Sequence, residues 1–414
     1  MAEIIFIFII AILVFDYLLE RLLDYLNSTY WSNEIPKELE GIYDAEKYKK
    51  SQDYQKVNQK FSLLTSSLSF IAMLLMILLG GFAIVDEFAR QFTLNPILLA
   101  LLFFGIIGFV TDLFSTPFTI YDTFVIEQKF GFNTTTVKTF VLDKLKAWLL
   151  ALVLGGGLLA LFVLIYTATG NNFWWIAWLS LSLVTVFFTM FYSNLIVPLF
   201  NKQTPLENGE LRDAIHAFAS KTGFQLKNIF VIDGSKRSNK ANAYFTGLGA
   251  KKRIVLYDTL IKDHTTEELV AVLAHEIGHY KKKHSIQGMI ISLLETGLML
   301  FILSWFIGKF NQDLGLALGV KPSFHIGILV FGMLYSPLSL ILGLALNILS
   351  RKHEYQADRF AGENYDTEAL KNALKKLSVN NLSNLKPHPA YVFFHYSHPT
   401  LLQRIAALNK INKQ

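Results

Sequence analysis

Two histidines four residues apart, with a glutamate directly after the first, carry the strongest chemical signal in this sequence. They lie in the run His275-Glu276-Ile-Gly-His279. Residues four apart share one face of a helix, so both imidazoles can reach a single tetrahedral ion. Glu276 is rotated by about 100° from His275 and lies close enough to take a proton from water at that ion. This spacing is typical of zinc peptidases.

The segment around this motif has the features of a helix. Thr265 and Glu268 have the spacing of a capping box, and apolar residues follow at helical intervals. The alternative interpretation is two solvent-facing histidines on a charged helix, which the run at residues 281–283 makes conceivable. A third ligand would favour the metal site.

The candidate for that ligand lies about 75 residues further along the chain. A catalytic zinc takes three protein ligands, and the absence of cysteine leaves histidine and carboxylates. Glu354 and Asp358 are four apart on a predicted helix, so Glu354 can complete the site while Asp358 accepts a hydrogen bond from a ligand histidine. His353 is a rival ligand whose side chain points about 100° away from that of Glu354.

The elements that must position these residues are predicted to cross a membrane. The 414 residues are 52% hydrophobic and 17% charged, against about 45–50% and about 25% in soluble proteins. This composition excludes a soluble enzyme and a disordered chain. Seven apolar runs can cross about 30 Å of hydrocarbon. They are Ile4–Leu22, Phe61–Val85, Pro96–Phe114, Ala147–Ala168, Phe173–Val197, Ile286–Gly308 and Phe324–Leu349.

The distribution of charge predicts an orientation. Of the 38 lysines and arginines, 34 lie in the segments that follow spans one, three, five and seven. The positive-inside rule then places the N-terminus outside and the C-terminus in the cytoplasm. Two spans separate His279 from Glu354, so both return to the cytoplasmic face. The net charge of +6 is explained by topology, and we expect no nucleic-acid partner.

The predicted organisation has four parts and a mainly α, polytopic fold. Residues 1–197 hold spans one to five, and residues 198–285 form a small α+β region that ends in the motif helix. Residues 286–349 hold spans six and seven, and residues 350–414 are mostly helical. Within the α+β region we expect one helix and three strands, at Glu207–Thr222, Ile229–Ile232, Ala241–Thr246 and Arg253–Leu256.

Several unlinked motifs give the chain a resemblance to the type-1 CAAX prenyl proteases, which are integral-membrane zinc metallopeptidases. Besides the histidine motif, the similar segments are Tyr121–Asn133, Pro198–Glu210, Asp233–Ser238 followed by Asn242-Ala-Tyr-Phe, Lys252–Leu260 and Ser397–Arg404. The resemblance covers most of the chain. It implies seven transmembrane helices around a large chamber and one zinc ion per chain.

The resemblance also implies roles for individual residues. Zinc would be bound by His275, His279 and Glu354, with Glu276 as the general base. Asp358 would be the aspartate behind the metal or a proton donor. Two further catalytic and substrate-binding groups lie in the C-terminal segment: His398 would steady the oxyanion and Arg404 would line the site. Asn242 would help to hold an extended substrate backbone beside Ala241–Thr246.

The resulting hypothesis is a membrane zinc endopeptidase that acts at the cytoplasmic face, in a bacterial inner membrane or the endoplasmic reticulum. Its partners would be the lipid bilayer and a peptide or protein substrate, with or without a prenylated C-terminus. A broad-specificity quality-control peptidase would use the same residues, and a transporter or channel is a less favoured alternative. No role is assigned to His284, His388 and His395. Asp112 and Glu295, inside apolar runs, would face an aqueous space or form helix–helix hydrogen bonds.

Overall fold

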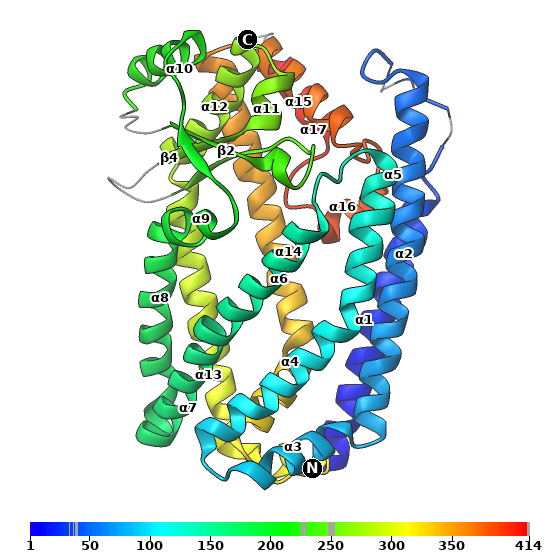
Figure 1. The fold of residues 1–414 in the computed structure, drawn as a ribbon, viewed down its shortest axis with the longest axis vertical. Helices are drawn as coiled ribbons and strands as arrows, with labels where there is room; N and C mark the ends of the chain where they lie inside the picture. The colour runs from blue at the N-terminus through cyan, green and yellow to red at the C-terminus, as the bar shows by residue number, and fades with distance from the viewer. Residues whose placement is uncertain (33, 36, 38–39, 225–228, 247–252, 412–414) are drawn as a thin grey trace.

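The chain folds into an elongated, mostly helical molecule with a small sheet at one end (Figure 1). The computed structural model describes all residues except 33, 36, 38–39, 225–228, 247–252 and 412–414. We call residues 201–283 together with 365–411 the globular end. The C-terminus lies at this end and the N-terminus lies at the opposite end of the long helices (Figure 1).

Long helices make up the rest of the molecule. They are α1 (Ala2–Ser28), α2 (Ala45–Leu78), α3 (Gly81–Phe92), α4 (Pro96–Tyr121), α6 (Val137–Leu150), α7 (Gly156–Thr169), α8 (Phe173–Leu195), α13 (His284–Ala317) and α14 (Phe324–Asn364). Short helical pieces join some of them: η2 (Asp122–Glu127), α5 (Gln128–Phe130), η3 (Ala151–Gly155), η4 (Gly170–Asn172) and α9 (Val197–Phe200).

Six continuous helical segments of the described chain are long and apolar enough to span a membrane. One of them, Val137–Phe200, has 64 residues, which is about three times the length that one crossing needs. Gly170, with a φ of +50°, ends α7 and turns the chain into η4 and α8. This segment therefore holds two of the predicted spans, and the structure agrees with seven crossings.

The second predicted span, Phe61–Val85, ends earlier in the structure than predicted. Helix α2 stops at Leu78, and Gly80 takes a left-handed φ of +68°, which a residue with a side chain rarely adopts. The chain then begins the separate helix α3 instead of continuing to Val85. The apolar run continues through this turn, so hydropathy alone does not mark it.

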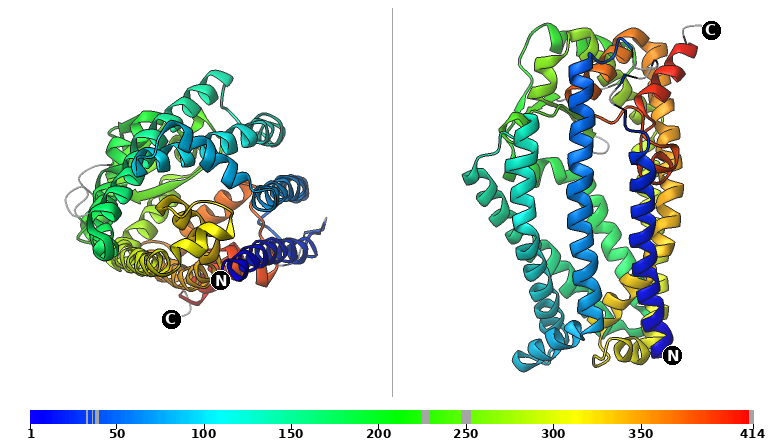
Figure 2. Two further views of the ribbon diagram at one scale, coloured as in Figure 1. Left: turned by 90° about the horizontal axis from the view of Figure 1, so that it is seen from below. Right: turned by 90° about the vertical axis from the view of Figure 1, so that its right-hand side faces the viewer.

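The long helices stand side by side as the wall of a ring (Figure 2). Only 6–17% of the residues in their apolar windows are buried, so each helix contacts its neighbours along a narrow seam. A ring with narrow contacts is the arrangement that the predicted chamber requires. Asp112, inside the third span, is held by a neighbouring helix of this wall: its carboxylate accepts hydrogen bonds from Lys144 and Trp148 of α6, both at 2.9 Å.

The sheet of the globular end has four strands in the order β1-β2-β4-β3. They are β1 (Gln203–Pro205), β2 (Ile229–Ile232), β3 (Ala243–Thr246) and β4 (Arg253–Tyr257). Strands β2 and β4 are parallel and the other pairs are antiparallel, which leaves β3 at an edge. The short strand β1 was not predicted. Strand β3 begins two residues later than expected, because Ala241 exchanges hydrogen bonds with the side chain of Asn381.

The motif helix α12 (Thr266–Lys281) is buried between the sheet and short helices. Helices α10 (Glu210–Lys221) and α15 (Thr367–Asn380) contact α12, and α11 (Asp258–Asp263) contacts β4. Further out, α16 (Pro389–His395) contacts α1 and α14, and α17 (Leu401–Ile411) contacts α14 and α15. On α12, Val270, Leu273 and Ile277 are fully buried, and they belong to the same core as Ile254 and Leu256 of β4. The burial of this apolar side fixes the direction in which the histidines project.

Candidate metal centre

Helix α12 begins as its sequence predicts. The Thr265 side chain accepts from the Glu268 backbone N–H, and the Glu268 carboxylate accepts from the Thr265 backbone N–H at 2.9 Å. Further along, Gly278 lets α12 approach α14 closely: a Cβ at this position would meet the Cα of Ala357 at 3.0 Å. Since His275, His279 and Glu354 all lie within one turn of this contact, the glycine sets the spacing of the site.

The structure brings together the three predicted metal ligands. His275 and His279 place their Nε2 atoms 3.1 Å apart. Glu354 Oε1 lies 3.2 Å from His279 Nε2, and Glu354 Oε2 lies 3.5 Å from His275 Nε2. All three ligand atoms fit within 4.8 Å of one another. In the described part of the chain, this is the one such group of histidine and acidic side chains.

The chemistry of these donors fits a cation. Glu354 is buried, and its Oε2 has no hydrogen-bond partner within the described residues. The facing Nε2 atoms would repel if both carried lone pairs with nothing between them. Burial opposes protonation of His275, but its hydrogen bond to Asp358 and the nearby carboxylate of Glu354 raise its pKa to about 9. A metal ion would displace that proton and satisfy all three donors.

Asp358 lies behind His275 and fixes the orientation of its ring. Its Oδ1 accepts from His275 Nδ1 at 2.9 Å, which leaves Nε2 to face the site. Arg404 holds the same carboxylate with two hydrogen bonds of 2.6 and 2.8 Å. The Arg404 side chain is only 12% exposed, so it is a largely covered partner of Asp358 and not a solvated surface arginine.

His284 lies in this centre, although no role was assigned to it from the sequence. It is buried, and its Nδ1 is 3.0 Å from His279 Nδ1. Its Nε2 donates to Gln356 Oε1 at 2.8 Å, so its Nδ1 is free to accept from His279. His279 is thereby held with Nε2 facing the site. The signal was present as a third histidine five residues after the motif, but the run of lysines before it indicated exposure.

Three other histidines that the sequence brought into question lie outside the ligand group. His353, the rival ligand, stacks on His284 with ring centroids 3.9 Å apart, and its Nε2 is 3.0 Å from Gln287 Oε1. His388 caps α16 by accepting from the backbone of Ala390, and His395 pairs with Glu20 at 3.5 Å.

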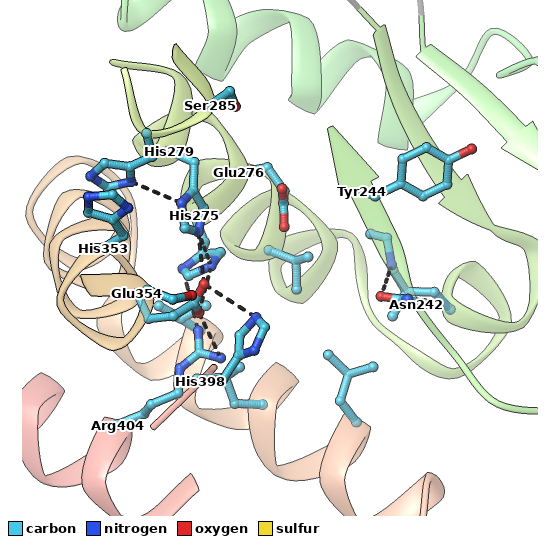
Figure 3. A pocket seen from close by; sticks show the side chains of 18 residues that line it. Asn242, Tyr244, His275, Glu276, His279, Ser285, His353, Glu354, His398 and Arg404 are labelled. Atoms are coloured by element: carbon cyan, nitrogen blue, oxygen red, sulfur yellow. Dashed lines mark hydrogen bonds and ion pairs between the residues drawn. The ribbon is translucent and has the colours of Figure 1, made fainter. Parts of the chain in front are cut away.

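A cavity of about 560 Å³ opens in front of the three ligands. Glu276 lines it and lies between the ligand cluster and strand β3 (Figure 3). Burial raises the pKa of Glu276 above its ordinary value, while the charges of His275 and His279 oppose this rise. A carboxylate with a raised pKa next to a cation site is suited to accept and return a proton.

Strand β3 and the C-terminal segment supply the other walls of the cavity (Figure 3). Asn242 is exposed immediately before β3, and Tyr244, which was not among the predicted site residues, follows inside the strand. His398 is 62% exposed and reaches Glu354 Oε1 with its Nε2 at 3.4 Å. All the predicted site residues except Asp358 therefore line this one cavity.

Helices of membrane-spanning length that carry such a centre define a membrane metallopeptidase. Two family profiles agree with this class. Residues 26–202 match the N-terminal region of CAAX prenyl proteases, described as five membrane helices, and residues 205–412 match peptidase family M48. The chain belongs to peptidase family M48, and the predicted class, a metallopeptidase, is confirmed.

Individual relatives extend over nearly the whole chain. "CAAX prenyl protease 1" of Saccharomyces cerevisiae is 36% identical over 92% of this chain and 90% of its own length. The human "CAAX prenyl protease 1 homolog" is 31% identical over 92% of this chain and 90% of its own. The crystal structure of S. mikatae Ste24p superposes with a TM-score of 0.92 at 35% identity, and covers 98% of this chain and 99% of that one.

Proposed function

We propose that this chain is a zinc endopeptidase that cleaves extended polypeptides next to a prenylated C-terminus. One observation carries the proposal: three donor atoms within 4.8 Å of one another face a cavity that Glu276 and an edge strand also line. Two imidazoles, one carboxylate and an open fourth position are the ligand set of a hydrolytic zinc site.

Zinc in this site would polarise the scissile carbonyl and lower the pKa of a water molecule toward about 7. Glu276 would accept the proton of the attacking water and return it to the leaving amine. His398 would donate to the oxyanion, and its exposure leaves it free to approach substrate. Arg404 would line the site and also hold Asp358 and Glu354 in place.

Strand β3 supports recognition of an extended substrate. It is the edge of the sheet and borders the cavity, so a substrate segment can add to it as a further strand. Main-chain hydrogen bonds of this kind give affinity with little demand on side chains. Asn242, exposed at the start of β3, would hold the substrate backbone.

The charge distribution supports an orientation with the N-terminus outside and the globular end in the cytoplasm. This end holds most of the lysines and arginines that follow the odd-numbered spans. The preference for a prenylated substrate comes from the names of the relatives in yeast and human. A broad-specificity membrane peptidase would use the same centre.

A pair of matched peptides tests the proposal. The purified chain in phospholipid nanodiscs is given a farnesylated C-a-a-X peptide and the same peptide without the lipid. We expect faster cleavage of the farnesylated peptide, and no cleavage by Glu276→Gln. Equal cleavage of both peptides would defeat prenyl recognition and favour the broad-specificity alternative. Cleavage of neither would contradict the peptidase assignment for these substrates.

A further inference from the structure

A second cavity lies at the junction of the long helices and the globular end. It has a volume of about 600 Å³ and is bordered by the end of α8, by α9 and the loop after it, and by strands β2 and β4. It shares no lining residue with the cavity at the metal centre. Neither the metal centre nor the proposed peptidase activity uses it.

Arg253 makes this cavity unusual. The sequence has eight arginines, and in the part of the chain that the structure describes, seven of them have an ion pair or a hydrogen bond. Arg253 has neither, although it is half-buried. The six residues before it, 247–252, contain no carboxylate that could serve as its partner. A half-buried guanidinium without an anion is costly.

The Arg253 side chain is arranged to receive an anion. Its guanidinium lies over the ring of Phe230, 4.6 Å from the centroid, and this stacking leaves its N–H donors free to bind a planar or tetrahedral anion. Burial lowers the pKa of Arg253, an effect that Tyr244 partly opposes. A bound anion would restore the stability of the charged form.

Two lysines add to the positive charge of this cavity. Lys202 and Lys236 line it, and Lys236 donates to the Phe200 carbonyl at 3.1 Å, which holds its ammonium group at the rim. Asp233 is the one acidic lining residue, and its carboxylate accepts from Asn201 Nδ2 at 2.9 Å and from the Lys202 backbone at 2.8 Å. The lining therefore has a net charge of +2.

The residues around this cavity indicate which kind of molecule carries the anion. The cavity opens where the apolar helix α8 ends, and Tyr192, Leu195 and Leu199 are exposed around that end. A basic pocket directly above an apolar, lipid-facing helix end is suited to a phospholipid headgroup, whose acyl chains can lie along the helix. We propose that this cavity binds the phosphate group of an anionic membrane phospholipid.

Lipid binding to the full chain tests this proposal. Nanodiscs of phosphatidylcholine containing phosphatidic acid carry wild type or the double variant Lys202→Gln/Arg253→Gln, and protein-bound phosphatidic acid is measured by native mass spectrometry. We expect affinity for phosphatidic acid to fall by about 10- to 30-fold in the double variant, because two cations near the membrane surface are lost. Lys138→Gln, which removes an exposed lysine of α6, should bind like wild type.

Further arms separate the alternatives. Arg253→Lys keeps the charge and should retain most of the binding, and the thermal unfolding midpoint of every variant shows whether it is folded. Equal phosphatidic acid binding by wild type and a folded double variant overturns the proposal. An equal loss of phosphatidic acid affinity in Lys138→Gln also overturns the proposal, because the loss would then reflect nonspecific charge attraction. Displacement of phosphatidic acid by millimolar inorganic phosphate would overturn the lipid source in favour of a free anion.

Discussion

The cavity in front of the three predicted metal ligands has two opposite walls that are built in different ways. The metal-side wall, formed by α12 and α14, is buried, and each of its two ligand histidines is oriented by a partner: His275 by Asp358, and His279 by His284. The strand-side wall is the edge strand β3 with the exposed Asn242. This difference is what the proposed mechanism requires: the chemical groups are fixed in advance, and a strand edge is open for an extended substrate.

The largest expected effect concerns the group between the two walls. Glu276→Gln keeps the shape of the side chain but removes the proton acceptor, so kcat should fall by about 10²- to 10⁴-fold. Zinc content should stay at the wild-type level. Peptide cleavage and metal analysis on the same sample measure both. Glu267→Gln, an exposed position on the same helix, serves as the control, and wild-type kcat in Glu276→Gln would exclude Glu276 as the base.

The next effect tests the metal-side wall. Asp358→Asn removes the carboxylate that orients His275 and pairs with Arg404, so zinc affinity should fall by about 10- to 100-fold. The measurement is competition for zinc with a chelator of known affinity. Unchanged zinc affinity in a folded variant would show that Asp358 does not hold the ligand.

A smaller loss is expected at the second orienting residue. His284→Ala removes the acceptor for His279 Nδ1–H and should weaken zinc binding by about 10-fold. His284→Gln, which can still present an acceptor oxygen, should recover part of this loss. The visible absorption spectrum of the cobalt-substituted protein reports the ligand geometry directly. A spectrum and affinity equal to wild type in His284→Ala would contradict the role of His284.

The smallest effect is expected on the strand-side wall, and it should take a different form. Asn242→Ala should raise KM by about 2- to 10-fold, the value of one hydrogen bond to substrate, and leave kcat and zinc content nearly unchanged. Asn380→Ala, whose side chain bonds Asp263 away from the cavity, is the control. A large fall in kcat with unchanged KM would remove the distinction between the two walls.

The sequence predicted the three ligands of the metal-side wall better than the side chains and turns that hold them in place. Two histidines four apart fix their own relative position on a helix, and the two spans between His279 and Glu354 bring the third ligand to the same end. The role of His284 depends on Gln356 of another helix, which spacing along the chain does not reveal. The turn at Gly80 lies inside an apolar run, and the late start of β3 depends on Asn381, about 140 residues away.

Metal content tests the central claim most directly. Purified wild type and Glu354→Ala, prepared side by side without added metal, are compared by elemental analysis and by thermal unfolding. The structure predicts about one zinc per chain in wild type and a large loss in Glu354→Ala, because only two of the three ligands remain. A wild-type chain without zinc that cleaves peptide, or equal zinc in both proteins, would contradict the assignment of His275, His279 and Glu354 as the metal site.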